Sequence, residues 1–411
     1  MRIEIIEQPE RLFEIVLDWD ELYRRDSHAH LYLSSDFLCA IAMRMASNFR
    51  VLVAWSDEGR CLGLLPLIVT TQWQKSQRRL VNVLDMLGHV FDADYTGMLC
   101  DSHNESAVAA AFADAVAEMT FERIVLNYFS APKTRLDAFT SAFDTRLFDS
   151  QSNEHIINNG QTNNRICPYI DLPDNYDDYL ALLSANTRQK LKRLQRQFDT
   201  DPTLSIRKSR PETYTRDVTI LSKLWYAKHV AQKGEQRARR LADMFKEVVM
   251  LGLANGMAYL AIVWRDDQPV AAQANFIDWT KRQALFHVAG RDERVRDVSV
   301  GMMLHAHCIR WGISKGLTRY DFTIGDEPYK YSLGGQDREI YSAEVFTRSG
   351  QNTTGMLDAQ CRDDVVELIR RYVADARHDD AAIAVRQAQE TWPELENTLG
   401  DLMMKVSGTS V

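Results

Sequence analysis

The sequence predicts a mixed α/β protein with two sheet-containing units and a helical tail. Apolar runs of strand length alternate with amphipathic helices through the first 350 residues. A chain of 411 residues exceeds the usual size of one domain and indicates two or three. Beyond residue 350 the pattern is helical. We therefore expect an N-terminal unit over residues 1–165, a second unit over 166–350 and a helical tail over 351–411.

Composition and charge restrict the class of protein. Hydrophobic residues make up 45% and charged residues 26% of the chain, as in ordinary globular proteins. A net charge of −8 argues against wholesale nucleic-acid binding. No apolar stretch reaches the ~18–20 residues of a membrane span, and the first residues do not form a signal peptide. Six scattered cysteines lack zinc spacing, so we expect a reduced cytoplasmic protein without a metal.

The first unit shows the order strand, helix, helix, hairpin, further strands, helix, strand. It lacks a glycine-led helix start, so we expect it to supply architecture and one wall of a cleft. In order, the main expected elements are a strand at 1–7, helices at 9–26 and 35–47, a hairpin at 49–72, an alanine-rich helix at 104–119 and a strand at 121–129.

The second unit is organised around residues 257–335. A helix is expected to start after Ser299, a residue type that caps helices, and to end near Gly316. A polar loop at 325–335 and a further strand, "REIYSAEVFT", are expected to follow. The strands that precede the loop are expected at 258–264, 269–278, 283–290 and 319–324.

The start of the helix after Ser299 predicts an anion site. The first N–H groups of a helix have no partner within it, and the helix dipole favours negative charge there. Gly301 removes a side chain from the first turn, which lets a phosphate or carboxylate approach closely. The residues expected to hold the donor are Ser299, Val300, Gly301 and Met302.

Several motifs of this stretch resemble a known family. They are Gly301, "IRWG" at 309–312, "YDF" at 320–322 and the heptapeptide "GDEPYKY" at 325–331. Together they resemble the GNAT-like bacterial acetyltransferases linked to cellulose and exopolysaccharide synthesis, the CelD/BcsL group. That group is related to the FemAB-like tandem GNAT transferases that build peptidoglycan bridges.

The resemblance implies tandem GNAT-like domains and an N- or O-acyltransferase. The implied donor is acyl-CoA, with acetyl or longer chains, and no metal is implied. In place of the Q/R-x-x-G-x-G/A loop of ordinary GNAT proteins, residues 296–301 contain one glycine. The carrier of the acyl group therefore stays open between CoA, an acyl carrier protein and aminoacyl-tRNA.

Two adjacent carboxylates, Asp326 and Glu327, are candidates for binding the acceptor and removing its proton. They follow the expected strand 319–324, in a loop closed by a proline. The resemblance supports a functional role for this loop. The alternative is that one carboxylate caps a turn and pairs with Lys330.

Asp321 and His287 are further candidate bases. On an alternating strand Asp321 and Thr323 share one face, so the carboxylate either faces the cleft or pairs with a neighbouring cation. His287 lies next to the helix start, and histidine titrates near neutral pH. The alternative for His287 is a hydrogen-bonded scaffold role.

Substrate contacts are expected from the acidic loop, from a polar cluster in the first unit and from a basic helix. Arg188, Lys192 and Arg196 share one helix face, which either binds phosphates or is simply solvated. The expected substrate-binding residues are Lys330, Tyr329, Tyr331, Asp94, Tyr95, Arg188 and Lys192.

These observations predict direct transfer of an acyl group from acyl-CoA to an amine or hydroxyl of a small-molecule or sugar-type acceptor. One alternative keeps the fold and takes the acyl group from an acyl carrier protein or from tRNA. Another is a non-catalytic scaffold protein of envelope polysaccharide synthesis. The acceptor and the oligomeric state are not specified by the sequence.

Overall fold

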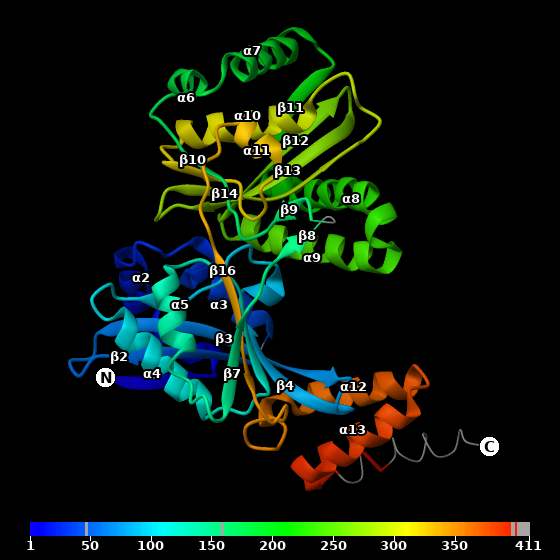
Figure 1. Ribbon diagram of the computed structural model, residues 1–411. Helices are drawn as coiled ribbons and strands as arrows, with labels where there is room; N and C mark the ends of the chain where they lie inside the picture. Colours follow the sequence, from blue (N-terminus) through cyan, green and yellow to red (C-terminus); the bar gives the residue numbers. More distant parts are fainter. Residues whose placement is uncertain (46–47, 158–159, 396–398, 401–411) are drawn as a thin grey trace.

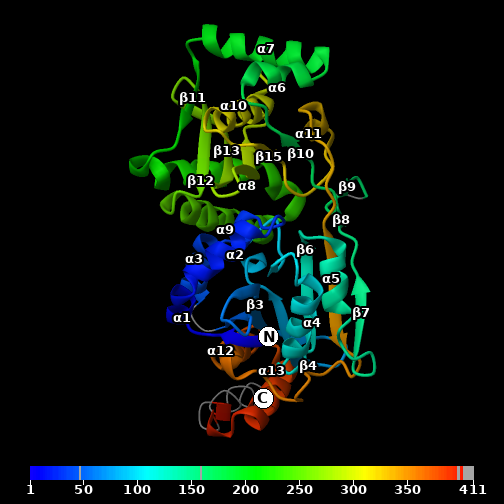
Figure 2. The same cartoon turned by 90° about the vertical axis from the view of Figure 1, so that its left-hand side faces the viewer.

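The computed structural model describes residues 1–45, 48–157, 160–395 and 399–400. Residues 46–47, predicted to end a helix, and 401–411 of the predicted tail lie outside this description. Two sheets are stacked along the long axis of the molecule, and helices lie between them and at both ends (Figures 1 and 2). No helix in the described ranges is long and apolar enough to cross a membrane.

The first sheet has eight strands. Seven follow one path, and β5 pairs with β3. Helices α1–α3 cover one face and α4, α5, α12 and α13 the other, which is why β2 is buried along its whole length. In sheet order, the strands are β1 (Arg2–Ile6), β2 (Phe49–Trp55), β3 (Cys61–Gln74), β4 (Arg79–Met86), β6 (Arg123–Phe129), β16 (Tyr341–Thr347) and β7 (Phe148–Ser152), with β5 at Leu99–Cys100.

The helices of the first unit come from both ends of the chain. The expected helix 9–26 is divided into two at Ile15, and the C-terminal helices α12 and α13 pack on the face that carries α4. The helices are α1 (Pro9–Glu14), α2 (Val16–Arg25), α3 (Ser35–Met45), α4 (Glu105–Ala117), α5 (Lys133–Thr140), α12 (Arg362–Ala374) and α13 (His378–Thr391).

Strand β16 corrects one expectation. The strand lies within the predicted second unit, residues 166–350, but it pairs antiparallel with β6 and β7 of the first sheet. It is the orange strand that runs from the second unit into the first sheet (Figure 1). The chain therefore returns to the first sheet before residue 350. The limits of the units, at residues 165 and 350, stay a prediction.

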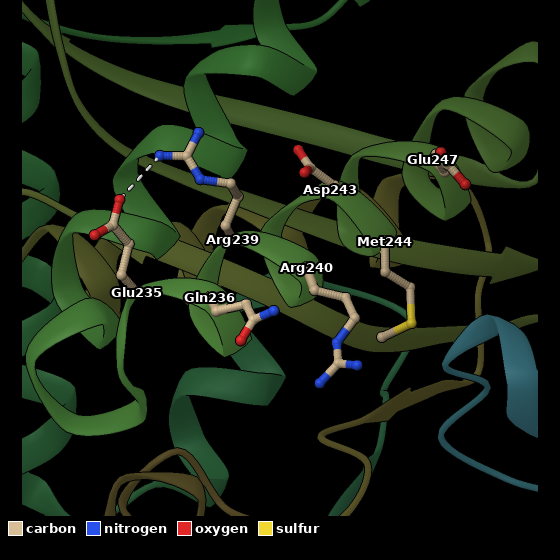
Figure 3. Close-up of a pocket in the computed structure, with 7 residues that line it drawn as sticks. All are labelled: Glu235, Gln236, Arg239, Arg240, Asp243, Met244 and Glu247. Atoms are coloured by element: carbon tan, nitrogen blue, oxygen red, sulfur yellow. Dashed lines mark hydrogen bonds and ion pairs between the residues drawn. The ribbon is translucent and has the colours of Figure 1, made fainter. Parts of the chain in front are cut away.

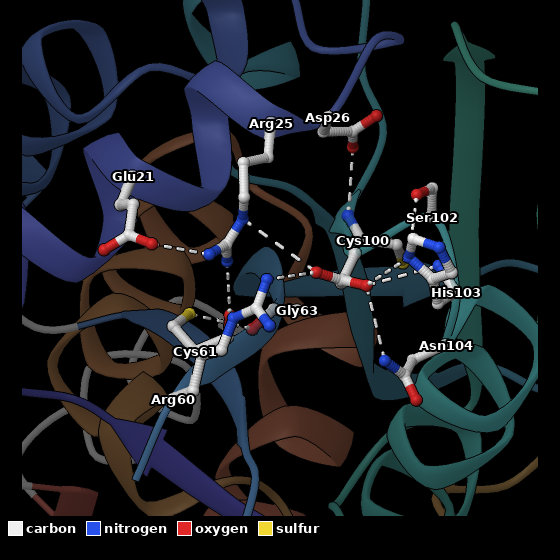
Figure 4. A network of polar contacts seen from close by, with 11 residues as sticks. Glu21, Arg25, Asp26, Arg60, Cys61, Gly63, Cys100, Ser102, His103 and Asn104 are labelled. Carbon is white, nitrogen blue, oxygen red and sulfur yellow. Dashed lines mark hydrogen bonds and ion pairs between the residues drawn. The ribbon is translucent and has the colours of Figure 1, made fainter.

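A polar network fixes α2 to the first sheet (Figure 4). Arg25 pairs with Glu21 at 2.6 Å and donates to the carbonyl oxygen of Cys61 at 3.1 Å. The neighbouring Asp26 accepts from the N–H of Cys100 at 3.0 Å and from the buried Arg135 guanidinium at 2.8 Å. Because both members of this ion pair are almost fully buried, each depends on the other for its charge to be compensated.

The second sheet has six strands, and β8 (Ile156–Ile157) and β9 (Thr162–Asn163) form a separate hairpin. Its strand order is β10 (Tyr169–Asp171), β15 (Arg319–Asp321), β14 (Gln283–Arg291), β13 (Gln268–Asp278), β12 (Ala258–Arg265) and β11 (Leu204–Lys208). Its helices are α6 (Tyr176–Leu182), α7 (Ala185–Thr200), α8 (Tyr214–Lys233), α9 (Glu235–Ala254), α10 (Val300–Ser314) and α11 (Pro328–Ser332).

The two units share a hydrophobic core. α7 and α10 cover one face of the second sheet, whereas α8 and α9 cover the other. One cluster of buried side chains includes Trp19 of α2, Phe37 of α3, Val249 of α9 and Phe276 of β13. The helices α8 and α9 therefore lie between the second sheet and α2–α3 (Figure 2), and this packing fixes the units relative to each other.

Candidate active site

Strands β14 and β15 run parallel and then separate. They pair only where Gln283–Leu285 lies beside Arg319–Asp321. Thr323 has a left-handed backbone (φ 56°), which a β-branched residue rarely adopts, and its hydroxyl donates to the carbonyl oxygen of Phe286 at 2.8 Å. Beyond this point β14 has no strand partner on that side, so main-chain groups of its C-terminal half are open to a ligand.

A β-bulge places His287 at the point of separation. Asn275 of β13 lies opposite Phe286, and Ala274 lies opposite Val288, so His287 is the extra residue on β14. Bulges bend a strand and re-aim a side chain. Here the bulge lies where β14 loses its second neighbour.

A cavity of ≈ 590 Å³ opens along this part of β14. Its walls come from β14, the start of α10, the α11 region, α7, α8 and α9. Gly290 allows α8 to approach closely, since a Cβ there would lie 2.4 Å from the backbone nitrogen of Trp225. The size is typical of small-molecule sites.

The first turn of α10 supplies free donors to this cavity. The N–H of Val300 bonds to the carbonyl oxygen of Val298, whereas the N–H groups of Gly301 and Met302 have no partner among the described residues. Ser299 is the N-cap residue, but its side chain makes no capping bond. A Cβ built on Gly301 would meet nothing within 4 Å. The turn therefore has room and two donors for an anion.

His287 is held by a carboxylate of the first unit. Its ring is 1% exposed, and its Nδ1 lies 3.1 Å from Asp94, which also accepts from the hydroxyl of Tyr32 at 2.7 Å. Since a carboxylate only accepts, Nδ1 carries the proton and donates it. Nε2 has no hydrogen-bond partner, and its nearest charged neighbour is Asp92 at 3.8 Å. Nε2 is itself buried, and in the neutral ring it keeps an unshared lone pair.

The charges around His287 tune its pKa. Burial lowers the pKa of His287, but the hydrogen bond to Asp94 and the charges of Asp94 and Asp92 outweigh burial and raise it above its ordinary value. Burial and the neighbouring Asp94 raise the pKa of Asp92 to about 6. These surroundings favour the protonated ring, so His287 is able to hold the proton that general acid–base catalysis transfers.

The acidic loop is divided between the cavity and the scaffold. Glu327 lines the cavity and forms an ion pair with Lys330 at 3.0 Å. Asp326 is outside the lining and accepts from the N–H of Asn163 at 2.7 Å. Lys330 is 1% exposed and donates to three carbonyl oxygens, those of Thr323, Ile324 and Gly325. These bonds give Asp326 and Lys330 structural partners, and part of the predicted loop is the short helix α11.

Asp321 and Tyr95 are likewise bound within the scaffold. Asp321 is 2% exposed and accepts from the hydroxyl of Tyr95 at 2.7 Å, from the N–H of Thr323 at 2.8 Å and from Arg338 at 2.9 Å. With these three donors, the carboxylate is fully engaged and does not line the cavity. The strand ends at Asp321, so the predicted alternation through residue 324 is wrong.

The remaining predicted residues divide in the same way. Ser299, Gly301, Met302 and Tyr329 line the cavity, whereas Val300 is buried beside them. Tyr331, Arg188 and Lys192 do not line it. Asp94 reaches the site through its bond to His287.

Sequence reasoning missed the wall formed by α8 and α9. Trp225, His229 and Phe245 line the cavity opposite α10. His305 lines it as well, where burial lowers its pKa to about 3, so its ring is neutral and bonds to the hydroxyl of Tyr320 at 3.0 Å. Nothing local in the sequence marks these residues, because α8 reaches β14 only through tertiary packing.

A second concavity of ≈ 780 Å³ lies on the outer side of α9 (Figure 3). All of its lining residues, among them Arg239, Arg240 and Glu247, come from this one helix. A surface made by a single helix encloses no ligand. Among the described residues, no group of three or more His, Cys, Asp or Glu side chains is placed to hold a metal.

The cavity lies where a parallel pair of strands separates, beside a bulge and a helix with a glycine in its first turn. Residues 185–331, which contain these elements, match the family described as "Acetyltransferase (GNAT) domain". The match extends from α7 to α11 and includes β14 and α10. No curated protein sequence matches the chain.

The crystal structure of FemX has a TM-score of 0.56 to this protein at 10% identity, with 84% of this chain and 97% of that chain covered. At this identity the likeness shows the fold alone. It confirms the predicted fold class, a mixed α/β protein with tandem GNAT-like units, to which C-terminal helices are added. A tandem GNAT protein from the clavulanic acid biosynthesis pathway is 12% identical (TM-score 0.46), with 84% of this chain and 98% of that chain covered. L-PGS from Bacillus licheniformis is 13% identical (TM-score 0.45), with 83% and 93% covered.

Proposed function

We propose that the protein transfers an acyl group from acyl-CoA to an amine or hydroxyl of a small-molecule or sugar-type acceptor. The acceptor atom attacks the thioester carbonyl, its proton passes to Nε2 of His287, and the CoA sulfur leaves with the electron pair of the broken C–S bond. One proton returns to the thiolate. No covalent enzyme intermediate is needed.

The observation that carries this proposal is the position of His287. His287 lines the same cavity as Gly301 and Met302, and its buried Nε2 has no hydrogen-bond partner among the described residues, like the N–H groups of those two residues. A base and an anion-binding turn in one cavity are what direct transfer from a phosphate-bearing donor needs. A non-catalytic scaffold gives no reason to bury a histidine between two carboxylates with one ring nitrogen free.

The donor fits the open part of the site. The pantetheine arm of acyl-CoA carries amides, which can pair with the main chain of β14 where β15 has separated. The pyrophosphate would meet the free donors of α10. Following the sequence resemblance, we place the acceptor in envelope or exopolysaccharide synthesis of the CelD/BcsL type.

Ligand-induced stabilisation tests the proposal. CoA, acetyl-CoA and longer acyl-CoAs are added to the purified protein, and a ligand at one hundred times its Kd stabilises by about 2.7 kcal/mol. Release of free thiol is then followed with a panel of amines and sugars. The control variant is Asp326→Asn, which changes a carboxylate outside the cavity and should give the same shift and thiol release as the unmodified protein. Absence of a shift with every CoA species, together with no thiol release, would refute an acyl-CoA donor.

A further inference from the structure

Positive charge is concentrated in one segment of this acidic protein. Residues 185–254 contain sixteen Lys and Arg against seven Asp and Glu, a formal net charge of +9, whereas the whole chain has −8. The segment comprises α7, β11, α8 and α9. A difference of this size produces a surface potential that selects partners by sign.

The cations of α7 have no internal partners. Arg188, Lys190, Lys192, Arg193 and Arg196 form no ion pair with any described residue. Elsewhere in the segment, Arg207, Arg216 and Arg239 are each paired with a carboxylate. Only Leu191 and Leu194 of α7 are buried, so the charged side chains of this helix lie on its solvent-facing side.

This basic surface continues to the mouth of the cavity. Lys190 of α7 and Lys228 of α8 line the cavity and are exposed. Arg291 at the end of β14 also lines it and is exposed, and it pairs with Glu293 at 2.9 Å. The helix α7 lies, with α6 beside it, at the end of the molecule farthest from the first unit (Figures 1 and 2). A partner that binds there would have its near edge at the cavity entrance.

We infer that α7 and the cationic mouth formed by Lys190, Lys228 and Arg291 dock an acidic carrier protein, which delivers its acyl group on a phosphopantetheine arm into the cavity. This inference rests on the transfer chemistry and the cavity of the proposed function, and it names a carrier-bound phosphopantetheine, in place of free CoA, as the group that presents the acyl chain. The reaction balances as it does for CoA: the C–S bond of the carrier thioester breaks, a C–N or C–O bond forms, and the carrier is left with a free thiol.

The surface favours a small acidic protein over RNA. Single-stranded RNA is bound by stacking on aromatic side chains, and the five cations of α7 have no exposed aromatic residue among them. Phe198, the aromatic residue of α7, packs against the core. The rest of the chain has a net negative charge, which would repel a long polyanion but not a partner confined to α7.

The test compares a double charge-reversal variant of α7 with a double charge-reversal variant of another helix, α12. Arg193→Glu/Arg196→Glu changes two exposed arginines of α7, and Arg370→Glu/Arg371→Glu changes two exposed arginines of α12 by the same charge. The probes are the acidic carrier protein of bacterial fatty-acid synthesis, with and without phosphopantetheine, and bulk tRNA. Binding is measured by fluorescence anisotropy at about 50 mM and about 300 mM salt, because screening weakens surface charge pairs.

We expect the carrier with its arm to bind, and higher salt or the α7 variant to weaken binding about tenfold or more. The α12 variant should bind within about twofold of the unmodified protein. Equal weakening by both variants, binding of tRNA without the carrier, or binding of neither probe would overturn the inference. A thermal shift with acyl-CoA in the same preparation reports on the proposed function, so a failure to bind the carrier is distinguishable from a failure of the proposed function.

Discussion

Asp94→Asn isolates the charge that we hold responsible for the behaviour of His287. The substitution keeps an oxygen that can accept from Nδ1 of His287 and from the hydroxyl of Tyr32. It removes the negative charge 3.1 Å from a ring that is 1% exposed. Burial favours the neutral ring, and the Asp94 charge that favours the protonated ring is then missing. The pKa of His287 should therefore fall.

The size of the change follows from this contact. An opposite charge at such a distance shifts a pKa by about 1–3 units, which corresponds to about 1.4–4 kcal/mol. The folded-state pKa of His287 is raised, so its protonation stabilises the fold fully below the unfolded-state pKa of about 6.5. That contribution disappears as the pH rises through the folded-state pKa. The unfolding free energies of wild type and variant should therefore differ most at low pH and converge at high pH.

Three measurements check this prediction. NMR titration of the His287 ring carbons gives the pKa directly, and the pH profile of kcat/KM should show its acidic limb, where the base becomes neutral, moved to lower pH in the variant. Urea unfolding at pH 5.5 and pH 8.5 gives the stability difference. An unchanged pKa in Asp94→Asn, or a stability loss that is the same at both pH values, would refute the coupling.

Three further substitutions separate catalysis, donor binding and scaffold. His287→Gln removes the base and should lower kcat by about 10²–10⁴-fold with little change in the thermal shift given by acyl-CoA; an unaffected kcat would exclude it as the base. Gly301→Ala should raise the Tm, because alanine favours a helix by up to ~1 kcal/mol and its methyl has space, yet weaken donor binding by calorimetry; unchanged affinity would place the donor elsewhere. Lys330→Met leaves three carbonyl oxygens and Glu327 without their cation and should destabilise by at least about 2 kcal/mol in urea; a stable variant with only a raised KM would restore its predicted substrate role.

Local patterns in the sequence predicted most of the second unit. Alternating and periodic apolar residues placed β12, β13, β14 and α10 within a residue or two of their observed ends. The glycine in the first turn of α10 marked the turn in which two N–H groups have no partner among the described residues. These features depend on backbone geometry and local spacing, which neighbouring residues specify.

The same approach could not rank the charged residues of the loop. Lys330 and Asp326 look equally available in sequence, but a buried ammonium must satisfy its donors, and Lys330 does so with the carbonyl oxygens of its own loop. Asp321 accepts hydrogen bonds from Tyr95, which is 226 positions away in the sequence, and from Arg338, which is 17 positions away. Long-range partners of this kind leave no periodic signal.

The sequence by itself determined which segments become strands and helices and where a helix start is left bare for an anion, because these depend on side-chain spacing and on the lack of a Cβ at Gly301. Only the tertiary structure decided that His287 lines the cavity beside two carboxylates of the first unit. Its orientation depends on Asp94 of the other unit, 193 positions away, and on the close approach of α8 at Gly290. Burial and the neighbouring charge set the pKa of the histidine, and both exist only once the two units are packed together.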